Sequence, residues 1–339
     1  MDLKAVAKVD LHRHLEGAIR LQTLIDLYRE AGEPLPEATP EELAPRAQVH
    51  APMASLEAVL AFFEIAQRAF RDVEAAERIA YEAVEDLALD HVRLAELRFS
   101  PDFLCRPHGL DWDEAFAAIL RGVERAAREH DVTVGLIAIV SRNYGMASAE
   151  RTVEFALKHR EDLVGFDLAD EERSYPPSMF VDVLAPIADA GLPLTAHYGE
   201  ATGPQFPREA IEALGVRRLG HGVSVADDPD VTALARERGV ALEMCPTSNH
   251  RTHAVERLAD HPARRMLDEG LLVTINTDDP GLFGIDLTHE LEACRSDLGF
   301  TDDELRRVTR NALDASFVDQ AAKNDVTRRH FEWAEPGRG

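Results

Sequence analysis

Short runs of apolar, often β-branched residues recur along the chain, separated by longer segments with helical periodicity. In Asp113–Glu129, for example, apolar residues recur at the three- and four-residue spacing of an amphipathic helix. Strands that alternate with helices are typical of parallel βα units. Eight runs are predicted strands, and eight strands close a (β/α)8 barrel, so we expect an α/β fold of the TIM-barrel type. The predicted strands are Lys8–His14, Arg93–Phe99, Thr133–Val140, Leu163–Leu168, Pro193–His197, Arg217–Gly220, Val240–Met244 and Leu272–Asn276.

The segment between the first two strands, about residues 15–92, is too long for one crossover helix, and it predicts a helical insertion. Three helices are expected in it, and Glu33–Pro52, which is rich in proline, resembles a linker. Insertions that follow a barrel strand lie at the carboxyl ends of the strands, where such barrels have their active sites. Ser55–Phe70, with Phe62 and Phe63, is therefore a candidate lid over a flat aromatic ligand, and packing between helices is the alternative. The expected helices are Leu21–Ala31, Leu56–Phe70 and Ala75–Leu89.

The length of 339 residues suits one barrel domain that spans residues 1–339. We find neither a signal-peptide pattern nor an apolar run long enough to span a bilayer, which predicts a cytoplasmic protein. A net charge of −25 argues against binding to nucleic acids or to anionic membranes. The expected partner is instead a small molecule, and the chain is expected to be a monomer or a weak homo-oligomer.

Polar side chains follow several of the predicted strands at their carboxyl ends. His12 and His14 end the first strand, and residues two apart on a strand point to the same side. His197 and His221 end the fifth and sixth strands or follow them directly, and the pair Asp278–Asp279 follows the eighth. Each is alone more typical of a buried structural histidine or a helix cap. Together, three histidines and a carboxylate predict a metal site that suits Zn²⁺ better than Ca²⁺ or Mg²⁺.

The fourth predicted strand bears on the number of metal ions. Barrel hydrolases with two metal ions usually bridge them with a modified lysine at the end of this strand. Leu163–Leu168 contains no lysine, and none of the four lysines of the chain ends a predicted strand. We therefore expect one Zn²⁺ per chain.

Seven short motifs span nearly the whole chain in a specific order and spacing. With them the chain resembles the adenosine deaminase family of the amidohydrolase superfamily. The resemblance implies an enzyme, a zinc-dependent hydrolase that replaces the 6-amino group of a purine nucleoside with oxygen and releases ammonia. Adenosine and 2′-deoxyadenosine, which would give inosine and 2′-deoxyinosine, are the expected substrates. The motifs are Asp10–Gly17, Glu96–Pro101, Gly165–Ala169, His197–Glu200, Gly220–Gly222, Pro246–Asn249 and Asn276–Pro280.

The resemblance also implies roles for individual residues. Glu200 would pass a proton to purine N1, His221 would orient the hydroxide that attacks, and Asp279 would hydrogen-bond purine N7. Burial beside an apolar purine is expected to raise the pKa of Glu200, so that this acid is protonated when substrate binds. The zinc ligands would be His12, His14, His197 and Asp278, and the residues at the substrate would be His14, Glu16, Asp170 and Asp279.

Three positions depart from the commonest pattern of the family, and all concern the substrate. Glu16 stands where the family usually has aspartate and where adenine deaminases have glutamate. Asp170 replaces a glycine that approaches the purine, and Tyr198 replaces alanine and is expected to add bulk beside the metal. His221 between two glycines is, in contrast, the adenosine-type version. Adenine or aminodeoxyfutalosine therefore stay alternative substrates, and a catalytically silent barrel that binds nucleosides is the alternative to an enzyme.

Overall fold

Eight parallel strands form the centre of the computed structural model, which describes residues 1–331 and 333. They form two four-stranded sheets, β1 to β4 and β5 to β8. Isolated bridges from Phe166 to Leu194 and from Arg13 to Asp278 join the two sheets at both edges, and so close the barrel. The predicted fold class is thereby confirmed. The strands are β1 (Lys8–His14), β2 (Val92–Phe99), β3 (Thr133–Ser141), β4 (Gly165–Ala169), β5 (Thr195–Tyr198), β6 (Arg218–His221), β7 (Ala241–Met244) and β8 (Leu272–Ile275).

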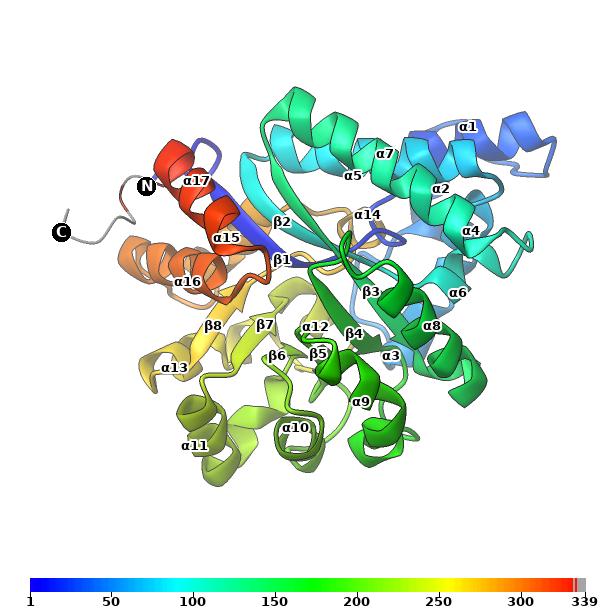
Figure 1. Cartoon of the computed structure of the whole chain (residues 1–339). Helices are drawn as coiled ribbons and strands as arrows, with labels where there is room; N and C mark the ends of the chain where they lie inside the picture. The colour runs from blue at the N-terminus through cyan, green and yellow to red at the C-terminus, as the bar shows by residue number, and fades with distance from the viewer. Residues whose placement is uncertain (332, 334–339) are drawn as a thin grey trace.

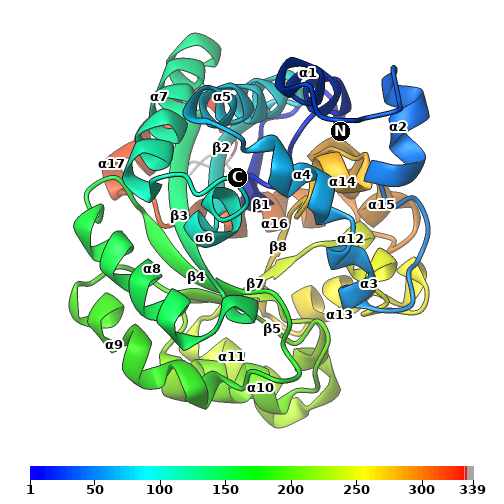
Figure 2. The same cartoon turned by 90° about the vertical axis from the view of Figure 1, so that its right-hand side faces the viewer.

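The helices surround the strands, which lie at the centre of the molecule (Figures 1 and 2). Side-chain caps define several of their first turns: the Asp111 carboxylate, for example, accepts hydrogen bonds from the first-turn backbone of α7. The helices are α1 (Leu21–Ala31), α2 (Pro40–Ala47), α3 (Leu56–Leu60), α4 (Phe63–Ala69), α5 (Val73–Leu89), α6 (Pro101–Cys105), α7 (Trp112–His130), α8 (Met146–Lys158), α9 (Val181–Asp189), α10 (Gln205–Glu209), α11 (Pro229–Arg238), α12 (Pro246–Arg251), α13 (Ala263–Asp268), α14 (Pro280–Phe283), α15 (Leu287–Ser296), α16 (Asp302–Ala315) and α17 (Gln320–His330).

The insertion between β1 and β2 differs from the prediction in two places. The expected linker Glu33–Pro52 contains α2, whose first turn is capped by the Thr39 hydroxyl and begins with a proline. The expected single helix Leu56–Phe70 is interrupted, because α3 ends at Leu60 and α4 begins at Phe63. Figure 2 shows α3 and α4 beside α14, and Phe62 packs there against a small apolar cluster that includes Phe283.

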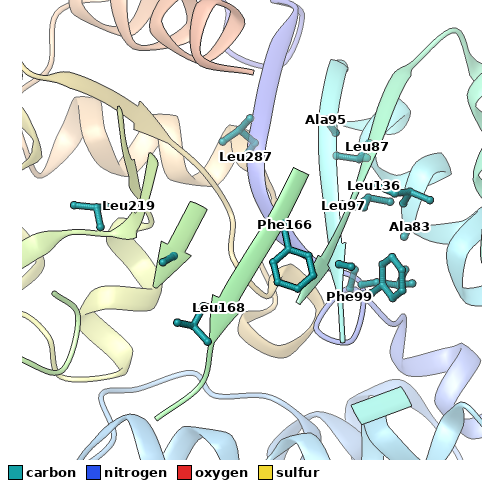
Figure 3. Close-up of a cluster of buried hydrophobic side chains, with 14 of the residues drawn as sticks. Ala83, Leu87, Ala95, Leu97, Phe99, Leu136, Phe166, Leu168, Leu219 and Leu287 are labelled. Carbon is teal, nitrogen blue, oxygen red and sulfur yellow. The ribbon is translucent and has the colours of Figure 1, made fainter. Parts of the chain in front are cut away.

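The hydrophobic core lies between the strands and the helices. Leu97 and Phe99 of β2, Leu136 of β3 and Ala83 and Leu87 of α5 belong to one buried cluster (Figure 3). Because side chains alternate along a strand, the residues between them face the barrel interior, which is polar here. No helix in residues 1–331 is both long and apolar enough to cross a lipid bilayer. The rigid barrel therefore fixes the side chains at the carboxyl ends of its strands.

Candidate active site

Four polar side chains converge at the carboxyl ends of β1, β5 and β8. His12, His14, His197 and Asp278 each offer one atom, and these atoms all lie within 4.8 Å of one another. The Asp278 Oδ1 is 3.1 Å from His12 Nε2 and 3.3 Å from His14 Nε2. His14 Nε2 is 3.1 Å from His197 Nε2. The four predicted ligands are thus brought together around one point.

The chemistry of this cluster fits a metal ion. His12 Nε2 is buried beside Asp278 Oδ1 but makes no hydrogen bond of normal geometry with any described residue, and an orphaned buried ring nitrogen is costly. Three ring nitrogens and one carboxylate oxygen form the N/O donor set of zinc-type sites. Ser248 donates its hydroxyl hydrogen to the other oxygen of Asp278 at 2.6 Å, which leaves Oδ1 directed at the histidines. These residues are able to hold one cation.

A buried ring of hydrogen bonds lies beneath the cluster. Glu243 of β7 lies 2.8 Å from His12 Nδ1, and Asp167 of β4 lies 3.2 Å from His197 Nδ1. Arg98 of β2 donates to both carboxylates, each at 2.8 Å. With Nδ1–H donated to a carboxylate, Nε2 of each histidine keeps its lone pair for a cation. We name these five residues the carboxylate–arginine ring: His12, Glu243, Arg98, Asp167 and His197.

Backbone geometry at the seam between β8 and β1 positions three of the four side chains. The Asp278 N–H donates to the His12 carbonyl and its carbonyl accepts from the His14 N–H, each at 2.8 Å. Asp278 and His221 both have positive φ, at 62° and 61°, which is rare for residues other than glycine and typical of functional sites. Gly17 packs against this seam so closely that a Cβ there would lie 1.9 Å from Asp279 Oδ1.

Glu200 and His221 lie together above the cluster. Glu200 Oε1 accepts a hydrogen bond from the Thr252 hydroxyl at 2.7 Å, and Oε2 is 3.5 Å from His221 Nε2. Burial, reinforced by the negative charge of Asp278, raises the pKa of Glu200 to about 8. The Glu172 carboxylate accepts the backbone N–H groups of Gly199 and Glu200, at 3.0 and 2.9 Å, and so fixes the loop that carries the acid.

A cavity of about 410 Å³ opens over these side chains. Phe63 of α4 lines it, and Phe63 meets Phe103 edge-on, with 6.0 Å between the ring centroids. The segment predicted as a lid therefore lines the cavity with Phe63, while its half-buried neighbour Phe62 packs against the small apolar cluster that includes Phe283. The cavity is also lined by Leu56, Leu60, Gln67, His14, Glu16, Asp170, His197, Glu200, His221, Asp278 and Asp279.

Comparison with known proteins identifies the family. The family model described as Adenosine deaminase matches residues 7–333. The adenosine deaminase of Shewanella denitrificans is 39% identical over 315 residues, which are 93% of this chain and 95% of the relative. That of Klebsiella pneumoniae is 37% identical over 320 residues, 94% of this chain and 96% of the relative.

This chain belongs to the adenosine deaminase family.

Solved structures agree with this assignment. An adenine deaminase from Arthrobacter aurescens superposes with a TM-score of 0.88 at 28% identity, over 97% of this chain and 99% of that one. A zinc-bound amidohydrolase from Burkhoderia ambifaria reaches 0.87 at 28% identity, over 98% and 91%. Arabidopsis ADAL in complex with GMP reaches 0.84 at 26% identity, over 98% of both chains. The chain is thus a hydrolase of the adenosine deaminase family on a (β/α)8 barrel.

The three departures from the adenosine deaminase pattern now have positions. Glu16 Oε1 accepts the Ser100 N–H at 2.6 Å, while Oε2 is buried without a partner, and burial raises the pKa of Glu16 to about 8. Asp170 accepts a hydrogen bond from the Ser141 hydroxyl, and burial raises its pKa to about 6. Its φ is 80°, the backbone region that glycine adopts most readily.

Tyr198 does not add bulk beside the metal cluster, contrary to the expectation. Its hydroxyl donates to the Tyr175 carbonyl at 2.9 Å, and the Arg142 guanidinium lies 4.3 Å from its ring centroid. Because neighbouring side chains on a strand point to opposite sides, Tyr198 faces away from the barrel axis that His197 faces. The substitution for alanine therefore changes packing behind the site and leaves the cavity lining unchanged.

Several residues of the site carried no expected role in the sequence. Arg98 and Asp167 lie inside two of the family motifs. A charged residue in an otherwise apolar, buried strand is the sequence signal that indicates a role for each. Glu243 is a lone carboxylate in the apolar strand Ala241–Met244, which carries the same signal. Glu172 and Thr252 lie in loops, where a polar residue is ordinary and no sequence signal separates them from their neighbours.

Proposed function

We propose that this chain catalyses the hydrolytic deamination of adenosine or 2′-deoxyadenosine, with one Zn²⁺ held by His12, His14, His197 and Asp278. The observation that carries the proposal is that Glu200, a buried carboxyl with a raised pKa, faces the same cavity as the four-residue cluster. Such a pair supplies both requirements of the reaction: activated water and a proton for the ring that it attacks.

The protein residues divide the chemistry between them. A zinc ion in this site would lower the pKa of a water molecule towards 7 and so supply hydroxide at neutral pH. Attack at purine C6 moves negative charge onto N1, and protonated Glu200 neutralises that charge by giving N1 its proton. The amino nitrogen then leaves C6 as ammonia with the proton of the new C6 hydroxyl group, and the proton released when water became hydroxide restores Glu200.

Asp279 and Asp278 are adjacent in sequence, but their pKa values are shifted in opposite directions. Burial, together with the charge of Asp278, raises the pKa of Asp279 well above its usual range. Although burial acts in the same direction on Asp278, the neighbouring His221 and His12 hold its pKa well below the usual range. Ionised Asp278 suits a cation, and protonated Asp279, whose Oδ1 has no protein partner, is able to donate to purine N7.

The lining of the cavity favours a nucleoside over a nucleotide. Among the described residues that line it there is no lysine or arginine, whereas Glu16, Glu64 and Asp170 are present. A phosphate group needs cationic or N–H donors, and carboxylates would repel it. ADAL, which was solved with GMP, is similar to this chain in fold but is a nucleotide complex. The volume of about 410 Å³ lies in the range that holds a ligand larger than a lone base.

Adenine is the second candidate substrate, and one residue favours it. By the family resemblance, glutamate at the position of Glu16 is also seen in adenine deaminases, and an adenine deaminase is among the similar structures. A glutamate reaches further into the cavity than aspartate and occupies space that a ribose would need. Aminodeoxyfutalosine, which is larger than adenosine, belongs in the same comparison.

A panel of 6-aminopurines tests the proposal. Zinc-loaded protein is incubated with adenosine, 2′-deoxyadenosine, adenine, aminodeoxyfutalosine and AMP, and released ammonia is measured. We expect the two nucleosides to give the highest kcat/KM and AMP to give almost none. Glu200→Gln is the matched control: it should keep the metal but lose activity by about 10²- to 10⁴-fold, because an amide has no acidic proton to give. Zinc-loaded wild-type protein that releases no ammonia would leave only the nucleoside-binding alternative.

A further inference from the structure

His221 ends a chain of three buried side chains that leads away from the cavity. Its Nδ1 is 2.9 Å from the Asn249 Nδ2, and the Asn249 Oδ1 is 3.1 Å from His261 Nε2. His261 Nδ1 is in turn 3.2 Å from the backbone nitrogen of Ala263. Among the described residues, none of the three side chains has another polar partner at these atoms, and all three are less than a tenth exposed. This series of hydrogen bonds therefore starts at the backbone N–H of Ala263, whose role as a donor is fixed.

The direction of every hydrogen bond follows from that amide. A backbone N–H only donates, so His261 Nδ1 accepts and has no hydrogen. Burial lowers the pKa of His261 to about 3, so the ring is neutral and its one hydrogen is on Nε2. That hydrogen is donated to the Asn249 oxygen, and the Asn249 amide group then donates to His221 Nδ1. His221 Nδ1 is thus an acceptor.

The opposite arrangement fails at the same place. If the Asn249 amide were turned around, its nitrogen would face His261 Nε2 and require a lone pair there. The hydrogen of a neutral His261 would then move to Nδ1, where it would oppose the Ala263 N–H at 3.2 Å. Two donors facing each other in a buried site leave both unsatisfied, which costs about 1–3 kcal/mol for each group.

We propose that Asn249 and His261 are positioning residues that fix His221 as the neutral tautomer with its hydrogen on Nε2. His221 then presents an N–H donor, and no lone pair, towards Glu200 and the reacting centre. In the deamination proposed above, on which this inference rests, the His221 Nε2–H would donate a hydrogen bond to the oxygen that attacks C6 and so orient it. The tautomer excludes His221 as the base that removes a proton from water.

The tautomer is measurable without turnover. Zinc-loaded protein labelled with ¹⁵N-histidine gives two-bond ¹H–¹⁵N correlations, and His221→Gln identifies the signals of residue 221. We expect an unprotonated Nδ1 and a protonated Nε2 for His221, and the same pattern for His261. A protonated Nδ1 at His221 in the wild-type protein would overturn the inference, whatever substrate the enzyme proves to use.

Two substitutions that change side-chain volume little distinguish a positioning role of these residues from a packing role. In Asn249→Asp, a carboxylate accepts from both neighbours, so the hydrogen of His221 should move to Nδ1. We expect kcat to fall by about 10²-fold, the effect of losing one donor at a developing charge, with KM changed less than about threefold. His261→Gln keeps an N–H donor towards Asn249 and should retain kcat within about threefold of wild type.

The controls distinguish the possible failures. Bound zinc and the thermal midpoint are measured for each variant, and both should remain near the wild-type values. A loss of kcat in Asn249→Asp with the wild-type tautomer unchanged would refute the proposed link between tautomer and rate. His261→Gln could lose as much activity as Asn249→Asp while its His221 signals remain those of wild type. Asn249 and His261 would then act through packing, and the inference would be wrong. If the wild-type enzyme deaminates no purine, the proposed function fails, and the spectra still test the tautomer.

Discussion

At the scale of single residues, the site depends on carboxyl groups that share one cavity but differ in charge. Glu200 and Asp279 are buried among other acids, and their pKa values are raised. Asp278 lies against histidines and is ionised. Pairs of titratable groups whose surroundings separate their pKa values are typical of acid–base enzymes. The sequence places these acids only a few positions from one another or from a histidine, so the protonation states follow from the surroundings and not from residue type.

The protonated state of Glu200 predicts a basic limit to activity. Glu200 gives a proton, so kcat/KM should fall as pH rises through its pKa, which is about 8. A nearby cation favours the ionised form and lowers the pKa of a carboxyl, so in the zinc enzyme the limb should lie at or below pH 8. The profile of kcat/KM for adenosine between about pH 5 and pH 10 measures it. Activity that keeps rising above pH 9 would contradict the role of Glu200 as acid.

Two other acids predict a change of substrate preference. Glu16→Asp shortens a side chain that faces the cavity, and Asp170→Gly removes another. Because the φ of residue 170 is 80°, glycine adopts this backbone without strain. We expect the double variant to raise the ratio of kcat/KM for adenosine over adenine by about tenfold, a usual effect of one methylene group in a pocket. Tyr198→Ala, which changes no lining residue, is the control, and an equal ratio in all three proteins would count against the hypothesis.

At the scale of elements, five strands contribute to the carboxylate–arginine ring. Each of these strands adds one side chain, and Arg98 of β2 connects the partner of His12 to the partner of His197. A guanidinium is planar and forms two hydrogen bonds in a fixed geometry, whereas an ammonium is a point charge. The ring therefore couples the orientation of two metal-facing imidazoles to a single arginine.

Arg98→Lys tests this coupling through the metal. The lysine should reach one carboxylate at a time, and metal affinity should fall by about 10- to 100-fold, as for other partners of metal ligands. Arg218→Lys is the matched control, because buried Arg218 contacts Glu243 and Glu96 but has no hydrogen bond to Asp167. Zinc affinity is measured by competition with a chelator. Equal losses in the two variants would show that any buried arginine of the barrel has the same effect.

The elements also show how far sequence patterns extend. Strand positions and the converging residues at strand ends are predictable because a polar residue after a buried apolar run is a local signal. The carboxylate–arginine ring is not predictable in this way, since Arg98, Asp167 and Glu243 come from separate strands and meet only in the closed barrel. The pattern does not predict α2, because the high proline content of Glu33–Pro52 is typical of a linker, although Thr39 and Pro40 carry a capping signal. The position of Tyr198 was predictable from strand alternation, which places it opposite His197.

At the scale of the whole molecule, charge dominates the surface. Sixty-two acidic residues stand against thirty-seven lysines and arginines, which gives a net charge of −25. Such an excess repels itself and destabilises the compact state. The ion pairs on the surface oppose this only weakly, because exposed pairs contribute about 0–1 kcal/mol each.

This excess of acidic residues predicts that salt stabilises the protein. Raising the ionic strength from about 0.01 M to 0.15 M shortens the screening distance from about 30 Å to about 8 Å and weakens the repulsion between distant acids. The thermal midpoint should rise by a few degrees in NaCl and equally in KCl. Scanning calorimetry of the zinc-loaded protein measures it. A midpoint that falls with either salt would mean that attractive pairs outweigh the repulsion.

The seam between β8 and β1 has a consequence for biosynthesis. The cluster needs His12 and His14 of β1 and Asp278, which follows β8, and these segments are joined by the bridge of Arg13 with Asp278 and by the backbone hydrogen bonds of Asp278 with His12 and His14. A nascent chain on the ribosome already displays three imidazoles long before it displays the carboxylate. Capture of the ion in its final geometry must therefore await the synthesis of Asp278, and the nascent histidines are open to the wrong metal until then.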